Sequence, residues 1–259
     1  MDKFKHKHSL GQNFLKDKGC LIKIIDSCKV EEDDLVIEIG PGQGALTKYL
    51  KLYNAQLLCF EIDLDTKKYL DKFEDEKTKV IYQDFMSSDV KSILSEYKYN
   101  NLYIIANLPY YITTPILKKI IDDKINAKEM VLMVQEEVAD RFSAQPGTKD
   151  YGAVTVYLNY YYEVSKLFKV GRNSFDPAPN VDSAVIKMVK RENKQSVDEE
   201  KLFTLVKDSF QMKRKNLRNN LRSYDLEKID SILTKYDLSL NNRAEDVSLD
   251  CFVEIANSL

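Results

Sequence analysis

Val36-Ile37-Glu38-Ile39-Gly40-Pro41-Gly42-Gln43-Gly44-Ala45-Leu46 runs from an apolar strand through a glycine-rich turn into the start of a helix. The glycines follow the spacing GxGxG, one place shorter than the GxGxxG fingerprint of dinucleotide-binding sheets. Glycine has no Cβ, so the backbone of such a turn can approach a ligand closely. The stretch therefore predicts the first strand–turn–helix unit of an open α/β sheet, with a ligand at the turn.

Strand-like and helix-like runs alternate outward from this stretch through the first two thirds of the chain. Short apolar runs indicate strands, and apolar residues at helical spacing separate several of them. This alternation predicts a mostly parallel, Rossmann-like sheet covered by helices on both faces. The expected strands are residues 35–39, 56–62, 79–82, 102–106, 129–134, 158–164 and 183–189, and helical patterns cover residues 45–52, 116–121 and 136–142.

The chain changes character after Arg191. Residues 192–196 are polar and typical of a linker, and helical spacing dominates beyond them. Asp198 has the side chain of an N-cap for the first of these helices. We expect a cofactor-binding domain over residues 1–192 and a small all-helical domain over residues 193–259.

The bulk composition is that of an ordinary globular protein. Of 259 residues, 44% are hydrophobic and 31% are charged, and no apolar run reaches the roughly 18 residues of a membrane-spanning helix. No apolar segment follows the basic N-terminus, so it is not a secretory signal. The four cysteines form no CxxC pair, and the two histidines, His6 and His8, crowd into the tail. We therefore expect a reduced, cytoplasmic protein without disulfides, a metal centre or a histidine-based triad.

Polar residues follow four of the expected strands at their carboxyl ends, where open α/β sheets bind ligands. The turn supplies Gly40 and Gly42, Glu61 ends the second strand, and Asp84 follows the third. A carboxylate at Glu61 can hold both ribose hydroxyls of an adenosine, and Asp84 suits the adenine amine. S-adenosylmethionine, which has no phosphate, fits the GxGxG turn better than NAD does. Glycines that serve packing and carboxylates that only lie on the surface are the competing interpretation.

The fourth strand ends at Asn107-Leu108-Pro109-Tyr110, which suits the presentation of a planar amine. The Asn107 side-chain oxygen and the Leu108 carbonyl before the rigid Pro109 can accept the two hydrogens of an adenine amine. The Tyr110 ring can stack on the base. Because the amine's lone pair is delocalised into the ring, acceptors that favour a more tetrahedral nitrogen help most in the transition state. A plain strand-to-loop turn is the alternative, since Asn and Pro are common turn residues.

A basic run lies in the expected helical domain, although the net charge of the chain is −2. For nucleic-acid binding the distribution of charge matters more than its sum. The density of the run favours contact with RNA phosphates over an ordinary solvated helix face. The run consists of Lys213, Arg214, Lys215, Arg218 and Arg222, and the N-terminal tail adds Lys3, Lys5 and Lys7.

These motifs resemble those of the rRNA adenine N6,N6-dimethyltransferase family and look closest to its bacterial small-subunit branch. The resemblance covers nearly the whole chain. It implies the sheet of a class I S-adenosylmethionine-dependent methyltransferase, followed by a small C-terminal all-helical domain that binds RNA. The motifs are residues 9–15 (SLGQNFL), 38–44 (EIGPGQG), 107–110 (NLPY), 175–185 (FDPAPNVDSAV), 210–221 (FQMKRKNLRNNL) and 243–249 (RAEDVSL).

The resemblance also implies contacts that spacing alone does not expose. Residues 12–15 look like a segment that folds over the methionine end of the cofactor, whereas a loop cap and a core leucine would be the simpler interpretation. Phe175 is a candidate for the second face of the target base, with a core aromatic as the alternative. The implied cofactor contacts are Asn13, Leu15, Gly40, Glu61, Asp84 and Asn107, to which the turn adds Gly42.

The implied substrate is a pair of adjacent adenosines, each dimethylated, in a loop near the 3′ end of 16S rRNA. The implied partner is a small-subunit assembly intermediate, and we expect the enzyme to act as a monomer. Leu108 stands where the DNA amino-methyltransferases of the NPPY type have a proline. The resemblance implies that this leucine suits two successive methylations. Three alternatives remain: an Erm-type 23S rRNA adenine dimethyltransferase, an rRNA-binding assembly factor with secondary catalysis, and a DNA adenine methyltransferase. The intact Glu61, Asp84 and NLPY argue against binding alone.

Overall fold

The computed structural model describes residues 12–259, which divide into two compact units. The first extends to Ala139 and resumes over Ser165–Lys190, and the second comprises Asp140–Val164 and Arg191–Leu259. The tail residues Lys3, Lys5, Lys7, His6 and His8, and the first three residues of the SLGQNFL motif, lie outside the described residues.

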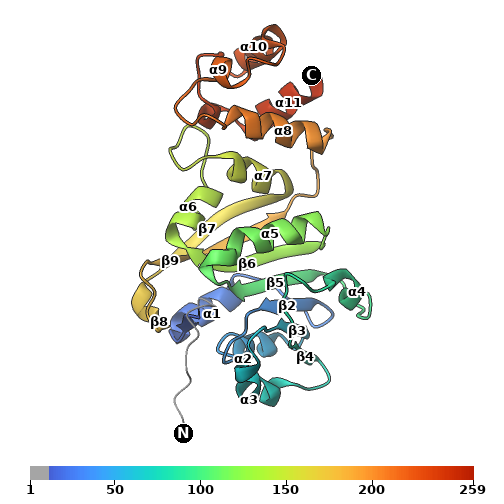
Figure 1. Ribbon diagram of the computed structural model, residues 1–259. Helices are drawn as coiled ribbons and strands as arrows, with labels where there is room; N and C mark the ends of the chain where they lie inside the picture. The colour runs from blue at the N-terminus through green and yellow to red at the C-terminus, as the bar shows by residue number, and fades with distance from the viewer. Residues whose placement is uncertain (1–11) are drawn as a thin grey trace. The chain divides into compact units, whose positions relative to one another are not determined.

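A seven-stranded sheet of order β4-β3-β2-β5-β6-β9-β7 forms the frame of the first unit (Figure 1). Its pairings from β4 to β6 are parallel, and β9 runs antiparallel to β6. The expected mostly parallel sheet is therefore confirmed. The strands are β2 (Leu35–Ile39), β3 (Gln56–Phe60), β4 (Thr78–Ile81), β5 (Leu102–Asn107), β6 (Ala127–Gln135), β7 (Tyr162–Val170) and β9 (Ser183–Lys190).

The strand order reverses direction between β2 and β5. From β2 the chain moves outward to β3 and β4, and β5 then returns to the other side of β2. Such a reversal leaves a crevice outside the carboxyl ends of the two central strands, which is where open α/β sheets bind ligands. Gly40 follows β2 and Asn107 ends β5, so both lie at this crevice.

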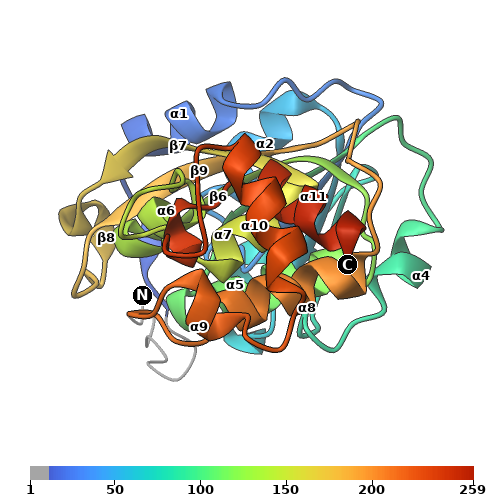
Figure 2. The ribbon, with the colours of Figure 1, turned by 90° about the horizontal axis from the view of Figure 1, so that it is seen from above.

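Both faces of the central strands are buried. All five residues of β2 are buried, as expected for a parallel strand between two helical layers. Alternate sheet residues, among them Val36 and Tyr103, join Leu21 and Ile24 of α1 (Lys18–Asp26) in one apolar core. Figure 2 shows α1 on one side of the sheet and α5 (Thr113–Asp122) on the other. The remaining helical elements of this unit are short: α2 (Thr47–Leu50), η2 (Lys51–Tyr53), η3 (Leu64–Thr66), α3 (Lys67–Leu70), η4 (Asp71–Phe73), α4 (Val90–Leu94), η5 (Tyr110–Ile112) and η6 (Arg172–Ser174).

A two-stranded sheet joins the N-terminal segment to the segment before β9. In it β1 (Phe14–Leu15) runs antiparallel to β8 (Phe175–Asp176), with Leu15 opposite Phe175. Both of these side chains are buried in the core beneath α1. This pairing fixes the position of residues 12–15 relative to the main sheet.

The second unit has a helical core of its own. Buried residues of α7 (Ala153–Tyr161), α8 (Glu199–Ser209), α10 (Leu226–Lys235) and α11 (Leu249–Ser258) pack together in it. The expected cap is present, because the Asp198 carboxylate accepts hydrogen bonds from the backbone of Glu200 and Lys201. Two short elements, α9 (Leu217–Asn220) and η7 (Ala244–Asp246), complete the unit, and α6 (Glu136–Phe142) crosses from the first unit into it.

One expected strand is wrong over most of its length. Residues 153–161 form α7, and strand β7 begins only at Tyr162. The tyrosines and valines there favour a strand by composition. However, Val156 and Tyr160 lie four residues apart and both enter the helical core, so packing overrides that preference. The second unit consequently includes residues 140–164, in addition to the residues after 192 that the sequence assigns to it.

All four cysteines are buried and free. Within residues 12–259, no helix combines the length and apolar character that crossing a membrane requires.

Candidate active site

A pocket opens at the carboxyl ends of β2, β3, β4 and β5, within the first unit. It brings together residues from all four strand ends and from the N-terminal segment. Of the residues predicted from the sequence, its lining includes Asn13, Gly40, Gly42, Glu61, Asp84, Asn107, Leu108, Pro109 and Tyr110.

The glycine turn is shaped by its neighbours. Gly42 has φ +58°, and a Cβ placed on it would collide with the ring of Phe14. Gly40 has φ +70°, and apart from its own residue and its two chain neighbours no atom lies within 4 Å of where its Cβ would lie, so its backbone faces open space. Left-handed φ values favour glycine. Gly42 therefore permits the close packing of Phe14, and Gly40 leaves room for a ligand.

The Glu61 carboxylate lies beneath this turn and is 5% exposed. Its Oε2 accepts the N–H of Gly42 at 2.8 Å, and its Oε1 accepts the N–H of Asp63 at 2.8 Å. Burial raises the pKa of Glu61, and the two backbone hydrogen bonds oppose that rise. Each carboxylate oxygen has a second lone pair, so Glu61 can hold the turn and still accept ligand hydroxyls.

A second buried carboxylate, Glu38, supports the turn from below. Its Oε2 accepts the hydroxyl of Thr47 at 2.6 Å and the thiol of Cys59 at 3.5 Å. Burial raises the pKa of Glu38 to about 7. The sequence places Glu38 in the glycine motif but gives it no role. Its position in the strand immediately before the turn was the available signal.

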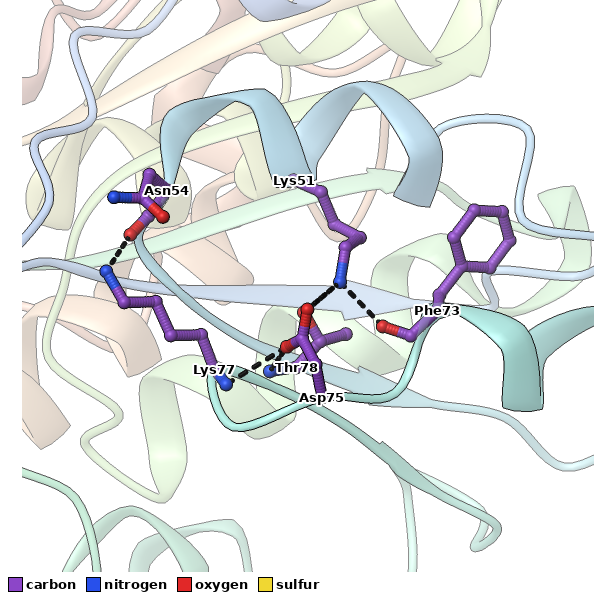
Figure 3. A network of polar contacts seen from close by, with 6 residues as sticks. All are labelled: Lys51, Asn54, Phe73, Asp75, Lys77 and Thr78. Carbon is purple, nitrogen blue, oxygen red and sulfur yellow. Dashed lines mark hydrogen bonds and ion pairs between the residues drawn. The ribbon is translucent and has the colours of Figure 1, made fainter.

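The far side of the turn rests on Phe73, which a polar network holds in place (Figure 3). A Cβ on Gly44 would collide with the Phe73 ring. Lys51 donates to the carbonyl of Phe73 at 2.7 Å and also pairs with Asp75. The hydrogen bond from Lys51 holds the pKa of Asp75 at about 2. These contacts tie η2 to the segment before β4 and so brace the glycine turn.

Residues 12–15, which we call the strap, have two polar attachments to the first unit. Gln12 Nε2 donates to the buried Asp63 carboxylate at 2.7 Å. The backbone carbonyl of Asn13 accepts the Asn107 side-chain Nδ2 at 3.0 Å. Gln12, Asn13 and Phe14 line the pocket; that this segment folds over the methionine end of a cofactor stays a prediction.

This attachment orients the Asn107 amide. Its nitrogen donates to Asn13, so its Oδ1 faces away from that carbonyl and finds no donor among residues 12–259. Leu108 is 1% exposed and its N–H donates to Met133 of β6 at 3.2 Å. Asn107 Oδ1 therefore remains an unused hydrogen-bond acceptor beside the Leu108–Pro109 peptide.

Two tyrosines follow Pro109 and differ in environment. The Tyr110 hydroxyl lies 2.6 Å from the Ser183 hydroxyl, and burial raises the pKa of Tyr110. The side chain of Tyr111 is 60% exposed and also lines the pocket. Tyr110 is thus a fixed ring inside the site, and Tyr111 is an open one at its edge. The sequence did not single out Tyr111.

Asp84 lines the same pocket and is half-buried. Its Oδ1 accepts the N–H of Met86 at 2.9 Å, within the turn that follows β4. Phe60 and Phe85 pack edge to face nearby, with ring centroids 5.3 Å apart, and both line the pocket. A carboxylate beside aromatic rings suits an adenine, which offers an amine at its edge and apolar faces.

Two predicted site residues are not brought into the pocket. Phe175 is 2% exposed and Leu15 is 4% exposed, and both side chains pack in the core beneath α1. Neither lines the pocket. For Phe175 this arrangement is the core aromatic that the sequence left as the alternative, because its ring is enclosed by apolar neighbours. Any cofactor contact of Leu15 would use its backbone.

The basic run lies in the second unit and is exposed throughout. It is not one helix face, because residues 211–216 form turns and only Leu217–Asn220 are helical. Lys213 and Lys215 line a pocket of this unit. The run consists of Lys213, Arg214, Lys215, Arg218 and Arg222.

The reversed parallel sheet, the glycine turn after β2 and the acidic residue after β3 define a class I methyltransferase. Within that class, the chain belongs to the family described as ribosomal RNA adenine dimethylase, which matches residues 3–259. The chain is 43% identical to ribosomal RNA small subunit methyltransferase A of Streptococcus gordonii, over 99% of this chain and 92% of the relative. It is 39% identical to the protein of the same name from a Geobacillus species, over the same shares.

Two solved structures share the fold over nearly the whole chain. A dimethyladenosine transferase from Plasmodium falciparum matches with a TM-score of 0.80 and 25% identity, over 94% of this chain and 96% of the other. The 23S rRNA methyltransferase ErmE matches with a TM-score of 0.76 and 23% identity, over 95% of this chain and 99% of the other.

Proposed function

We propose that the protein transfers methyl groups from S-adenosylmethionine to N6 of adenosines in 16S rRNA. The expected product is a pair of adjacent N6,N6-dimethyladenosines in a loop near the 3′ end. The relatives named ribosomal RNA small subunit methyltransferase A support this choice of subunit. We further propose that the enzyme acts as a cytoplasmic monomer on a small-subunit assembly intermediate.

One observation carries the proposal: the orientation of the Asn107 amide. Because its nitrogen is engaged by the Asn13 carbonyl, its oxygen is the atom available to a ligand in the pocket. An exocyclic amine needs acceptors, and the Asn107 oxygen and the Leu108 carbonyl supply two. The base must leave its stack to reach them, which costs least in a loop or a single strand.

The residues of the pocket fit S-adenosylmethionine. Glu61 would bind the ribose hydroxyls, Asp84 the adenine amine, and the strap of residues 12–15 would cover the methionine end. Bound there, the cofactor supplies an electrophilic methyl group on a positively charged sulfur. Gly40 gives it space because nothing lies within 4 Å of that residue's Cβ position.

The protein's contribution to the rate is position and hydrogen bonding. Acceptors at Asn107 and Leu108 favour a more tetrahedral nitrogen, so they bind the transition state better than the ground state. Tyr110, fixed by Ser183, would stack on one face of the base. A methylated ammonium is acidic enough to lose its proton to water, so no side chain is needed as a general base. Orientation of the two reactants should supply most of the acceleration.

The test is methylation of isolated ribosomal subunits. Purified protein is incubated with labelled S-adenosylmethionine and either small or large subunits that lack the modification. We expect N6,N6-dimethyladenosine in the small subunit, and the Asn107→Ala variant, which should react much more slowly, serves as the control. Label only in the large subunit would favour an Erm-type activity. Tight binding to small subunits without label would favour a pure assembly factor.

A further inference from the structure

The active-site pocket has an exposed aromatic ring at its edge, that of Tyr111. The side chain is 60% exposed although it lines the pocket. Among residues 12–259 its hydroxyl has no hydrogen-bond partner, and its ring has no aromatic or cationic neighbour. Exposed apolar side chains that are scattered singly need no explanation. This one borders a ligand site, so its flat face is a candidate contact for the ligand.

The backbone around Tyr111 is fixed, so the exposed ring starts from a defined position. Pro109 has φ −58°, and its carbonyl accepts the N–H of Ile112 at 3.1 Å. The element η5 that follows is a 3-10 turn, in which successive side chains diverge by about 120°. Because Tyr110 is held by Ser183, the Tyr111 ring projects in a different direction from the same short element.

Tyr111 lies on the side of the pocket that we assign to the RNA. In the described part of the chain, one other large hydrophobic side chain is both exposed and in the pocket lining, that of Ile62, which is 52% exposed. Ile62 directly follows Glu61, which we assign to the ribose of the cofactor. Tyr111 instead comes four residues after Asn107. Its ring therefore borders the acceptors for the amine.

The nucleotides next to the target base must cross this edge. The acceptors at Asn107 and Leu108 hold one base at a time, and the sugar–phosphate chain continues away from it in both directions. Where two adjacent adenosines are the targets, the one that is not reacting is such a neighbour. Unpaired loop nucleotides expose the faces of their bases, and proteins commonly bind those faces with aromatic side chains.

We propose that Tyr111 stacks on the base of a nucleotide adjacent to the target adenosine, and that in one of the two reactions this neighbour is the second target. The inference rests on the proposed function. Stacking on an aromatic ring accepts any base, because every base has a π-face. Tyr111 thus holds the RNA chain at the edge of the pocket, while Tyr110 and Asn107 orient the base that reacts.

A contact to the neighbouring nucleotide has a distinct kinetic signature. Its stack is the same before and during methyl transfer, so it stabilises the ground state and the transition state equally. The loss of such uniform binding raises KM and leaves kcat unchanged. Tyr111→Ala should therefore raise the KM for small subunits by about 5- to 100-fold, as the loss of one base stack does.

The experiment measures initial rates of methylation against the concentration of unmodified small subunits, at saturating S-adenosylmethionine. Tyr111→Phe keeps the flat ring and should restore the wild-type KM. Tyr111→Leu keeps apolar bulk without a ring face and should resemble Tyr111→Ala; it also carries the test should the alanine variant unfold. The matched control is Leu52→Ala, which removes a side chain that is 75% exposed on η2, outside the pocket. Its KM and kcat should match wild type.

The neighbour itself is tested with small subunits reconstituted from 16S rRNA that carries an abasic ribose at one or the other adenosine of the pair. Removal of the base on the side of Tyr111 should abolish the effect of Tyr111→Ala on the KM of the remaining adenosine. Removal of the base on the other side should preserve that effect. The comparison is a double-mutant cycle, which isolates the coupling between the ring and the missing base.

Several outcomes would overturn the proposal. They are a wild-type KM in Tyr111→Ala, an effect of Tyr111→Ala that is equal on the two abasic substrates, and an equal rise of KM in Leu52→Ala. A fall in kcat with a wild-type KM would place the ring on the target base and overturn it too, as would a weakened Kd for S-adenosylmethionine. Absence of dimethyladenosine from small subunits treated with the wild type would instead refute the proposed function.

Discussion

Replacing Glu61 should chiefly weaken cofactor binding. Its carboxylate is buried and accepts two backbone N–H groups at 2.8 Å each, and we assign its remaining lone pairs to the two ribose hydroxyls. Hydrogen bonds to a charged group contribute about 1.5–3 kcal/mol each. Glu61→Ala removes two from the complex, about 3–6 kcal/mol, which corresponds to a Kd for S-adenosylmethionine raised by about 10²- to 10⁴-fold.

The magnitude depends on the glycine turn as well as on the ligand. Without the carboxylate, the N–H groups of Gly42 and Asp63 lose their partner and the turn loosens. Glu61→Gln is no mild substitute, because its amide nitrogen would face one of those two N–H donors. We therefore expect Gln to lose most of the affinity that Ala loses.

The assay is calorimetric titration of S-adenosylmethionine into each variant, with Glu96→Ala as the control. Glu96 is an exposed carboxylate of the same unit outside the pocket. The turnover number at saturating cofactor should fall much less than the affinity. A Kd within about twofold of wild type in Glu61→Ala would refute the assignment of the ribose to this carboxylate.

Three further predictions address other parts of the site. Asn107→Ala should cut the rate of methyl transfer by about 10²- to 10³-fold, as the loss of one oriented hydrogen-bonding group does. Because Asn107 also holds the strap through Asn13, the cofactor Kd should rise, but far less than in Glu61→Ala; full turnover would contradict the proposed orientation of the amine. Glu38 has a pKa of about 7 in the folded protein against 4.5 for the free side chain, so the unfolded chain ionises first as pH rises. The free energy of unfolding should therefore fall by about 3 kcal/mol between about pH 4.5 and about pH 7. Chemical denaturation of Glu38→Gln, which keeps an acceptor for Thr47, should lack this fall, and a pH profile identical to that of wild type would contradict the burial of an ionisable group there. Gly42→Ala forces a Cβ into the Phe14 ring at φ +58°. The variant should therefore melt at a lower temperature than wild type and bind S-adenosylmethionine more weakly. A melting temperature and a cofactor Kd that both match wild type would show that the strap of residues 12–15 is not packed on the turn.

The central sheet could be predicted from the sequence because its strands are short, continuously apolar and followed by polar residues. The strand over residues 35–39 matches β2 in both bounds. The structure of the segment around Leu158 could not be predicted, because its tyrosines favour a strand and only packing in the helical core makes it the helix α7. Local composition carries no information about that partner.

In the site, too, some features could be predicted from the sequence and others depend on tertiary contacts. Glu61, Asp84 and Asn107 could be predicted as site residues from the sequence, because parallel strands bring their carboxyl ends to one edge of a sheet. The orientation of the Asn107 amide depends on the Asn13 carbonyl, 94 residues away in sequence, and the Tyr110 hydroxyl depends on Ser183, 73 residues away. The burial of Phe175 depends on its pairing with Leu15. Such contacts are set by the tertiary fold, so spacing along the chain does not reveal them.

The most direct test of the account is nucleoside mass spectrometry of small subunits after complete reaction with S-adenosylmethionine. We predict N6,N6-dimethyladenosine at two adjacent positions near the 3′ end of 16S rRNA. Subunits treated for the same time with Asn107→Ala, which should react about 10²- to 10³-fold more slowly, should carry only a trace of it. Methylation confined to 23S rRNA, or modification at an atom other than adenine N6, would contradict it.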